Sequence, residues 1–246
     1  MKKLFYCSCV LCGIMLSMAC SKDETIQDNT RKGVEYVTDS CTHEYVDLGL
    51  PSGTLWATTN VGADSAYQCG DYFAWGETEP KSNYADETYC FTSENGDYWK
   101  GEYTKYNYVD GKLVLDSIDD VANKRWKQSW RMPTKENVAE IDSMCVWTDT
   151  IVHSVNCVKI TSKINGNYII MPYAGFCFGM SNRGYGKELM YWTSSIKLSS
   201  NNCLAYQMSN RNVDNDLMSL HGFNSSKLSS FYGRRVGMPI RPVRKR

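Results

Sequence analysis

The sequence predicts an α+β domain in which a few helices pack against short, irregular antiparallel strands. Three observations predict this class. Short apolar and aromatic runs are broken by Gly, Asn, Asp and Ser every eight to twelve residues, one window has strong helical spacing, and one Asn-Gly pair lies between two β-rich runs.

The expected strands are rich in β-branched and aromatic residues and end at turn residues. In the first half of the chain they are Val46–Leu50, Thr54–Thr59 and Tyr72–Trp75. In the second half they are Met190–Ser194, Cys203–Met208, Leu217–His221 and Met238–Val243. Between them we expect a hairpin of Val158–Thr161 with Tyr168–Met171, because Asn165-Gly166 separates these two runs.

The strongest helical window is Thr134–Met144. Thr134 is a suitable N-cap, whereas Asn137, three residues on, lacks the carboxylate of a full capping box. The apolar residues at helical spacing are Val138, Ile141, Met144 and Cys145.

A second, weaker helix is expected at Ser117–Trp126. Asp119 and Asp120 lie near its start, where negative charge favours a helix N-terminus. Paired carboxylates also serve glycosidases, but at a helix start we interpret this pair as structural.

The N-terminus has the features of a secretory signal. Lys2 and Lys3 precede an uncharged apolar run that ends at Ala19, and Cys20 follows. We expect a signal peptide at residues 1–19 and lipid attachment at Cys20, although Leu16 lies one place earlier than in the usual lipobox. An ordinary cleaved signal or an uncleaved anchor is the alternative.

We expect residues 20–41 to form a lipidated, flexible tether, because this stretch is polar and has no periodic apolar positions. Its start, Ser21-Lys22-Asp23-Glu24, resembles the acidic signal that exports lipoproteins to the cell surface in Bacteroidota. We therefore expect an outer-membrane lipoprotein exposed at the cell surface, held to the membrane only through its N-terminal lipid. Residues 42–246 are expected to form one domain.

The charge balance argues against nucleic-acid partners. Twenty-seven basic and twenty-seven acidic side chains cancel, so no field steers the chain toward nucleic acid or anionic lipid. We interpret the basic cluster at the end of the chain as a solubilising, solvated end. Its members are Arg241, Arg244, Lys245 and Arg246.

The cysteine pattern assigns no metal site. Of the eleven cysteines, those expected to remain in the domain are at positions 41, 69, 90, 145, 157, 177 and 203. Export permits disulfides, but spacing does not decide the pairing, and isolated cysteines also serve as small buried residues. None of these seven cysteines forms a CxxC pair or lies beside a histidine at metal-ligand spacing, so we assign no zinc site and no cofactor.

Several distinctive motifs follow one another along the chain. The first is Tyr45-Val46-Asp47-Leu48-Gly49-Leu50-Pro51-Ser52-Gly53-Thr54-Leu55-Trp56-Ala57. It is followed by Gly70–Glu77 (GDYFAWGE), Trp130–Thr134 (WRMPT), Met171–Gly175 (MPYAG), Tyr191–Ser195 (YWTSS) and Gly237–Val243 (GMPIRPV). From about residue 42 to the end, the chain resembles the Fibrobacter succinogenes major paralogous domain lipoproteins.

That family is similar to the C-type-lectin-like fold, in the branch that includes formylglycine-generating enzymes. The resemblance implies a lectin-like fold, with Met132 and Met238 in place of the usual Leu and Phe, and with Asn137 where an aromatic is common. It does not imply a function, since such folds carry unrelated sites.

We do not expect an enzyme. A formylglycine-generating enzyme would carry a reactive cysteine pair near the closing block, where this chain has Pro242. The three histidines are scattered, and neither a Gly-x-Ser-x-Gly nor a His-Glu-x-x-His motif occurs. Trp192-Thr193-Ser194 offers no carboxylate where calcium-dependent lectins carry one. Asn212–Asp216 supplies oxygen ligands for a weak site, but an exposed turn explains it equally, so no metal is assigned.

The segment from Tyr191 to Gly233 is the expected ligand-binding region. It holds ten Ser and six Asn interleaved with aromatics, a composition suited to recognition loops, although solvated loops have it too. The candidate ligand-binding residues are Trp192, Asn201, Asn202, Tyr206, Asn210, Asn212, Asp214, Asn215, Asp216, His221, Asn224 and Tyr232.

The expected function is binding of a glycan or protein ligand through this region. The region also resembles the variable segment of lectin-like proteins diversified by retroelements, which a nearby template copy and reverse-transcriptase gene would test. The alternative from another class is a structural or assembly component of a surface appendage, and an enzyme comes third.

Most tryptophans are expected to lie in the core, with Trp99 and Trp147 the better candidates for exposed platforms. Tyr84–Tyr108, which contains six tyrosines, reads as a long insertion that either contacts a ligand or lies over the core.

Overall fold

The computed structural model describes residues 36–38, 43–92, 103–127, 129–198, 204–210 and 228–246, with the main chain alone at 36–38 and 228–232. Residues 33–246 form one compact unit. Residues 1–32 form another, which lies outside the described residues together with the expected signal peptide and Cys20.

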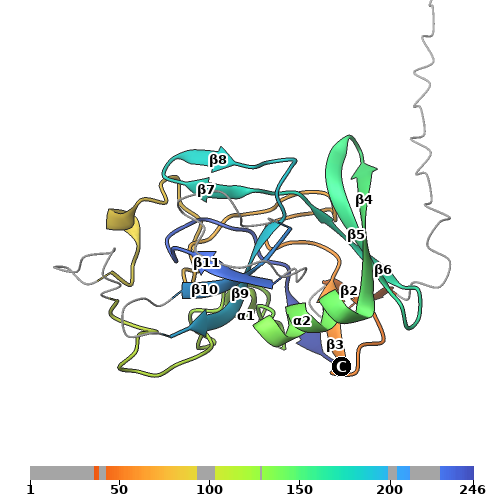
Figure 1. Ribbon diagram of the computed structural model, residues 1–246, viewed down its shortest axis with the longest axis horizontal. Helices are drawn as coiled ribbons and strands as arrows, with labels where there is room; N and C mark the ends of the chain where they lie inside the picture. Colours follow the sequence, from red (N-terminus) through yellow and green to blue (C-terminus); the bar gives the residue numbers. More distant parts are fainter. Residues whose placement is uncertain (1–35, 39–42, 93–102, 128, 199–203, 211–227) are drawn as a thin grey trace, which may run out of the picture. The chain divides into compact units, whose positions relative to one another are not determined.

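The described residues form small antiparallel sheets with two α-helices, a mixed class of the α+β kind (Figure 1). The sheet orders are β1-β2-β3-β12, β11-β10-β9, β4-β5-β6 and β7-β8. The strands are β1 Tyr36–Thr38, β2 Glu44–Asp47, β3 Thr54–Ala57, β4 Cys145–Val152, β5 Val155–Ser162, β6 Tyr168–Pro172, β7 Phe176–Phe178, β8 Ser181–Arg183, β9 Met190–Lys197, β10 Leu204–Ser209, β11 Leu228–Tyr232 and β12 Val243–Lys245.

Most of the predicted strands in this part of the chain form, with shifted ends. There are two exceptions. In Tyr72–Trp75, Phe73 forms only an isolated bridge with Met238, and in Met238–Val243, strand pairing begins only at Val243. The strand expected at Leu217–His221 lies outside the described residues.

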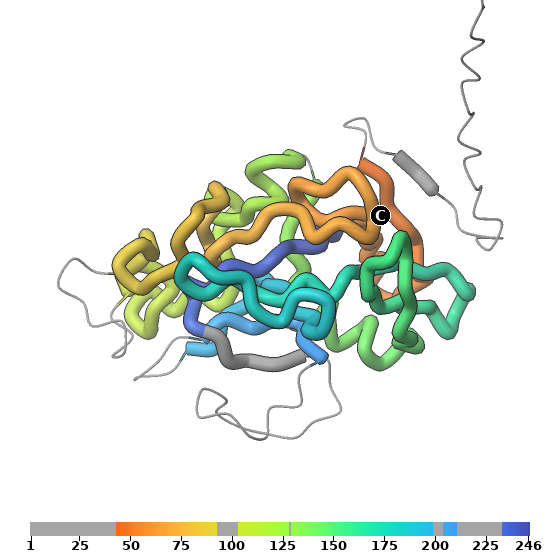
Figure 2. Tube along the Cα trace, turned by 90° about the horizontal axis from the view of Figure 1, so that it is seen from above, coloured from red at the N-terminus to blue at the C-terminus, as the bar shows by residue number. Residues whose placement is uncertain are grey.

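The C-terminal segment runs through the middle of this unit, shown in blue in Figure 2. Gly237 bridges Cys177, Met238 bridges Phe73, and β12 pairs antiparallel with β3. The last strand therefore joins the first sheet and ties segments from distant parts of the sequence together.

Both predicted helices form, and the structure corrects the capping of the first and the length of the second. Helix α2 spans Lys135–Met144 with Thr134 as N-cap, as predicted, and Cys145 is both its C-cap and the first residue of β4. Asn137 completes the capping box after all, because its amide oxygen accepts from the Thr134 N–H at 3.1 Å. Asn137 is also buried and donates to Thr54 Oγ1 at 3.0 Å, so a polar network replaces aromatic packing at this position.

Helix α1 is shorter than predicted, spanning Val121–Trp126. Asp120 is its N-cap and accepts from the Asn123 N–H at 3.1 Å and the Met132 N–H at 2.8 Å. This carboxylate is therefore structural, as the sequence indicated. Burial raises the pKa of Asp120, and the main-chain donors oppose that shift.

The predicted β5–β6 hairpin is confirmed, and β4 adds a strand that the sequence analysis missed. β4 and β5 are joined by a two-residue turn at His153 and Ser154, whose φ values are 46° and 63°. Residues other than glycine rarely adopt positive φ, and His153-Ser154 is not one of the Asn-Gly or Asp-Gly pairs that mark such turns. The sequence therefore did not predict a hairpin here.

The tryptophans within the motifs that carry the family resemblance lie in the core, as expected. Trp75 donates its indole N–H to Thr193 O at 2.8 Å, and Trp192 donates to Phe73 O at 3.0 Å. Those that are fully buried are Trp56, Trp75, Trp130 and Trp192. Trp147 is half-buried against the core beside α2, and Trp99 lies outside the described residues.

The interpretation of the C-terminal basic cluster as a solvated end is wrong for Arg241. Its guanidinium is completely buried and donates to Asn60 Oδ1 at 2.8 Å, Thr58 O at 2.7 Å and Ala57 O at 3.1 Å. Burial lowers the pKa of Arg241 to about 10. Arg241 therefore supplies donors to two main-chain carbonyls at the end of β3 and to the buried side chain of Asn60.

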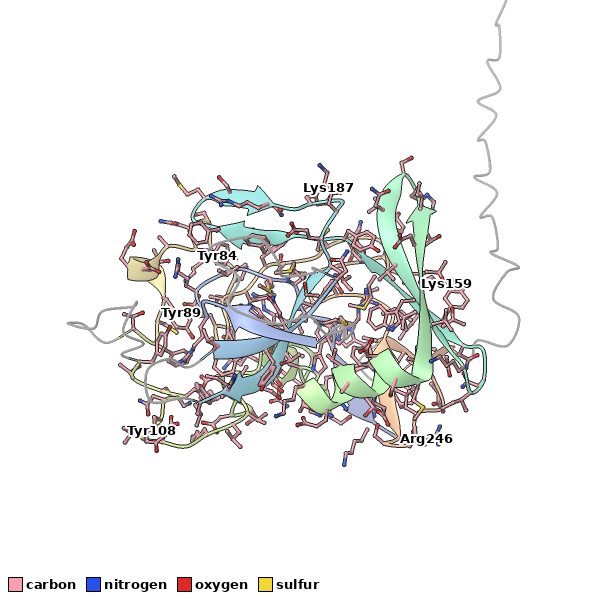
Figure 3. All side chains as sticks on the ribbon, viewed as in Figure 1. Tyr84, Tyr89, Tyr108, Lys159, Lys187 and Arg246 are labelled. Carbon is pink, nitrogen blue, oxygen red and sulfur yellow. The ribbon has the colours of Figure 1, made fainter. Side chains whose placement is uncertain are left out.

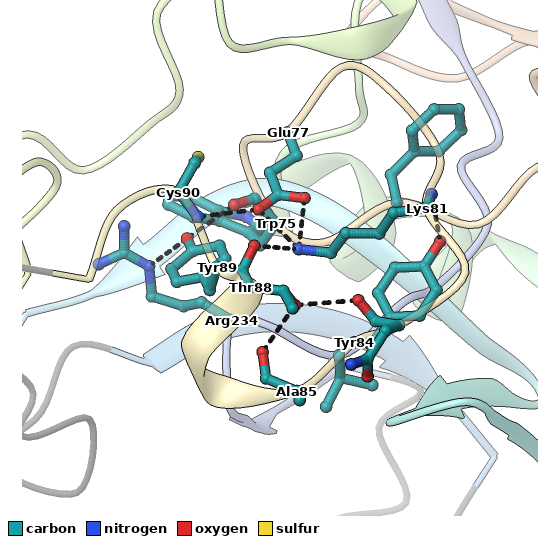
Figure 4. A network of polar contacts seen from close by, with 12 residues as sticks. Trp75, Glu77, Lys81, Tyr84, Ala85, Thr88, Tyr89, Cys90 and Arg234 are labelled. Carbon is teal, nitrogen blue, oxygen red and sulfur yellow. Dashed lines mark hydrogen bonds and ion pairs between the residues drawn. The ribbon is translucent and has the colours of Figure 1, made fainter.

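The described parts of the insertion at Tyr84–Tyr108, residues 84–92 and 103–108, pack on the core through most of their tyrosines. Tyr84, Tyr89, Tyr103 and Tyr106 are buried, whereas Tyr108 is exposed. Figure 4 shows the polar contacts around Tyr89, whose hydroxyl accepts from Arg234 Nε at 2.9 Å. The Arg234 guanidinium lies 4.0 Å from the Tyr103 ring centroid and 5.0 Å from that of Trp75, so rings of the core and of the described part of the insertion surround this cation.

Candidate functional site

A cleft of about 480 Å³ opens between the β4–β5 hairpin and the turn at residues 184–188. This volume lies in the range of small-ligand sites. The lining residues are Asp149, Thr150, Ile151, Asn156, Tyr173, Gly186, Lys187 and Asn210. We call this the Asp149–Lys187 cleft.

The floor of the cleft continues one face of the β4-β5-β6 sheet. Ile151 is in register with Asn156, and Tyr173 N–H donates to Asn156 O at 3.0 Å, so these three residues form a row across the strands. Residues further along the same face, Val158 and Met171 among them, are buried beside α2. In Figure 1, α2 lies at the open end of the β4–β5 hairpin, and the turn that joins the two strands lies at the opposite end.

Hydrogen bonds fix the opposite wall in place. Asn156 Nδ2 donates to Gly186 O at 2.9 Å, and Gly186 N–H donates to Tyr173 O at 2.7 Å. Asn210 Oδ1 accepts from the Leu189 N–H at 2.8 Å. The turn is thus bonded both to the sheet and to the end of β10, which preorganises the cleft.

Gly175 permits the close approach of this turn. It has φ of 63°, and a Cβ there would lie 2.1 Å from Arg183 O. Its N–H donates to Glu188 O at 2.8 Å. Only glycine fits both requirements, so Gly175 sets the position of Lys187 across the cleft.

The cleft combines an aromatic ring with charges of both signs. The half-buried Tyr173 donates its hydroxyl to Asp149 Oδ1. Burial, and then this hydrogen bond, raise the pKa of Tyr173 above its ordinary value. Lys187, labelled in Figure 3, is exposed, and no described side chain pairs with its ammonium. One carboxylate and one ammonium leave the lining without net charge.

The structure brings one of the predicted ligand-binding residues to this cleft, namely Asn210. Trp192 must be withdrawn from that set, because it is fully buried and its N–H is bonded within the core. Tyr206 is half-buried beneath the Lys135 ammonium, at 5.1 Å, and does not line the cleft.

The other predicted residues are not placed. Those outside the described residues are Asn201, Asn202, Asn212, Asp214, Asn215, Asp216, His221 and Asn224. Tyr232 ends β11, but only its main chain is described.

Sequence reasoning missed Asp149, Tyr173 and Lys187. Tyr173 lies in the recurrent block Met171–Gly175, where Pro172 ends β6, so a turn of the chain was detectable there. Asp149 belongs to the missed strand β4, and nothing in the sequence around Lys187 indicates that it faces this strand.

No group of three or more His, Cys, Asp or Glu suited to a metal occurs within the described ranges. The described cysteines all have free thiols, namely Cys69, Cys90, Cys145, Cys157 and Cys177. Burial raises the pKa of Cys157 and of Cys177 to about 11. These thiols therefore stay protonated at neutral pH and are poor nucleophiles.

Among the described residues, no helix has the length and apolar character needed to cross a membrane. Comparisons with protein-family models, with curated proteins and with solved structures gave no match.

Proposed function

We propose that this protein is a surface lipoprotein, lipidated at Cys20, that binds a neutral glycan in the Asp149–Lys187 cleft. The observation that carries the proposal is the preorganised cleft itself. Its walls are bonded to each other, while the Lys187 ammonium and the Thr150 hydroxyl form no hydrogen bond with another described residue.

The chemistry of the lining favours a sugar. Sugars present hydroxyls that both donate and accept, together with C–H faces that pack on rings and methyl groups. Asp149 offers a carboxylate oxygen beyond the one bonded to Tyr173, Lys187 offers donors, and Ile151 is 70% exposed. A strongly charged ligand would meet one like charge here, which favours a neutral one.

The proposed location and fold family rest on the sequence, with support from the packing. The motifs that resemble the Fibrobacter paralogous domain supply fully buried tryptophans. The pairing of β12 with β3 is compatible with a C-type-lectin-like domain, in which the chain ends meet. The assignment of the region after Asn210 to ligand contact, and its diversification by a retroelement, stay predictions.

A glycan array tests the proposal. The full chain, solubilised in mild detergent, is compared with Asp149→Ala/Lys187→Ala. The matched control is Asp64→Ala/Lys124→Ala, which removes the same charges at exposed positions outside the cleft. We expect neutral oligosaccharides to bind the wild type and the control and to lose binding to the cleft variant. Absence of binding by all three would refute the proposal.

A second function, assembly into a surface appendage, is favoured by a different observation. Five large apolar side chains are exposed within one segment, at Tyr108, Val109, Leu113, Val114 and Ile118. The segment is braced, since Asp110 accepts from the Tyr106 and Asn107 N–H groups and Lys105 pairs with Asp116 at 3.0 Å. A rigid apolar surface is typical of a protein contact.

Cross-linking on cells distinguishes this second function. Assembly predicts a ladder of cross-linked species that Leu113→Ser/Ile118→Ser removes. The control is Met180→Ser, which changes an apolar residue that is 84% exposed in another part of the chain. A ladder that survives the double substitution would exclude this segment as the contact.

A further inference from the structure

Strand β4 is an edge of its sheet, and its main chain has a well-defined outward side. Among the described strands, the order β4-β5-β6 leaves β4 with one neighbour. In a two-residue hairpin, the pair beside the turn, here Val152 and Val155, exchanges hydrogen bonds, and bonded pairs then alternate. Ile151 and Asn156 therefore form a non-bonded pair. Consistent with this, Asn156 O accepts from Tyr173 on the other side.

It follows that Ile151 and Asp149 direct their N–H and C=O groups away from β5. No other described main chain bonds to these two residues. Ile151 is 70% exposed, and Asp149 is exposed as well. The strand sequence, CVWTDTIV, has β-branched and aromatic residues and neither Pro nor Lys, and Asp149 is its single charged residue.

We propose that β4 pairs antiparallel with β4 of a second copy of this chain, about a two-fold axis at Thr150. An antiparallel strand pair is compatible with a two-fold axis, which makes the same strand complementary to itself. In this register Asp149 of one copy faces Ile151 of the other, and each such pair exchanges two hydrogen bonds.

Neighbouring registers are disfavoured on two grounds. An axis at Asp149 sets two carboxylates directly opposite one another, which is destabilising. An axis at Thr148 shifts the turn at 153–154 of the second copy alongside α2, because Cys145 follows this helix directly and its N–H donates to Ile141 O. The axis at Thr150 keeps the partner strand clear of the helix.

The dimer also extends the candidate site. Asp149 and Ile151 are two residues apart, so they lie on the same face of β4, and both line the cleft. Pairing brings the equivalent residues of the second copy beside them. The two clefts then become parts of one surface, able to bind two units of a longer glycan chain. This consequence rests on the proposed glycan site, whereas the dimer itself does not.

Cysteine cross-linking of the full chain in bacterial membranes tests the register. Residues opposed in a non-bonded pair have Cα atoms about 4.5 Å apart, within disulfide reach. Thr150→Cys is therefore expected to give a reducible band of twice the monomer mass after mild oxidation with copper phenanthroline. In the matched control, Thr148→Cys, the equivalent residues are offset by four positions, about 13 Å, and no such band is expected.

A charge exchange provides the second measurement and guards against misfolding. Thr150→Lys and Thr150→Glu, each purified in detergent, are expected to have the mass of a monomer by light scattering. Their equimolar mixture is expected to recover the dimer mass. Equal cross-linking of the two cysteine variants would overturn the register. A monomer mass for the wild type at every concentration, with no cross-link, would overturn the dimer and leave the array result to decide the glycan site separately.

Discussion

Replacing Arg241 by Met tests whether the end of the chain is a structural element of the core. The substitution roughly keeps the side-chain volume and removes the donors to Asn60 Oδ1, Thr58 O and Ala57 O. Each buried acceptor left without a partner costs about 1 to 3 kcal/mol, or about 6 kcal/mol for the three together.

Removing the cation offsets part of this loss. Burial lowers the pKa of Arg241 from 12.5 to about 10. At about 1.4 kcal/mol per pKa unit, this shift corresponds to roughly 3 kcal/mol that the protonated group loses on folding. The net expectation for Arg241→Met is a decrease of about 3 kcal/mol in the free energy of unfolding, or roughly 6 to 12 °C in Tm for a domain of this size.

Urea unfolding followed by tryptophan fluorescence measures this change, with Arg246→Met as the control. Arg246 is exposed, so its substitution is expected to change the free energy of unfolding by less than about 0.5 kcal/mol. Equal stability of the two variants would refute the structural role of Arg241 and restore the interpretation of the C-terminus as a solvated end.

Three further outcomes are expected. Burial raises the pKa of Tyr89 and Tyr191 above 10, so above pH 10 the unfolded chain releases protons that the folded chain retains. The free energy of unfolding should then fall by about 1.4 kcal/mol per pH unit for each tyrosine, partly offset by Arg241, as pH-dependent urea unfolding would show. Gly175→Ala should cost about 2 to 4 kcal/mol and displace the turn that carries Lys187; unchanged stability and glycan binding would contradict this. Asn137→Ala should cost about 2 kcal/mol in thermal unfolding, and no change would exclude the capping network.

The mixed class and the main helix were predictable because they depend on local patterns. Thr134 before Val138 and Ile141, and Asn165-Gly166 between two β-rich runs, act over a few residues. The same applies to the tryptophans of the recurrent blocks, whose large apolar surface requires burial.

What escaped the sequence analysis depends on long-range contacts. The turn at His153 and Ser154 is held in positive φ by the pairing of β4 with β5 rather than by glycine. Local sequence patterns predict that Arg241 is exposed, because its hydrogen-bond acceptors lie some 180 positions away in the sequence. A pattern of polar and apolar residues predicts that an arginine near a chain end is solvated. The tertiary fold is needed to show that Ala57 O and Thr58 O accept from it.

The candidate site shows the same division. Composition pointed to the region around Asn210, which does line the cleft. It also selected Trp192, whose ring is required by the core. Asp149 and Lys187 are unremarkable in the sequence because they come together only when the β4–β5 hairpin meets the turn at residues 184–188.

The measurement that tests the central claim most directly is calorimetric titration of the full chain with the neutral oligosaccharide that binds most strongly on the array. Asp149→Asn keeps the size of the side chain but removes its charge, and Asp64→Asn does the same at an exposed position outside the cleft. Loss of one charge-assisted hydrogen bond, about 1.5 to 3 kcal/mol, predicts at least a ten-fold weaker affinity for Asp149→Asn and no change for Asp64→Asn. Equal affinities of the wild type and both variants would contradict binding in the Asp149–Lys187 cleft.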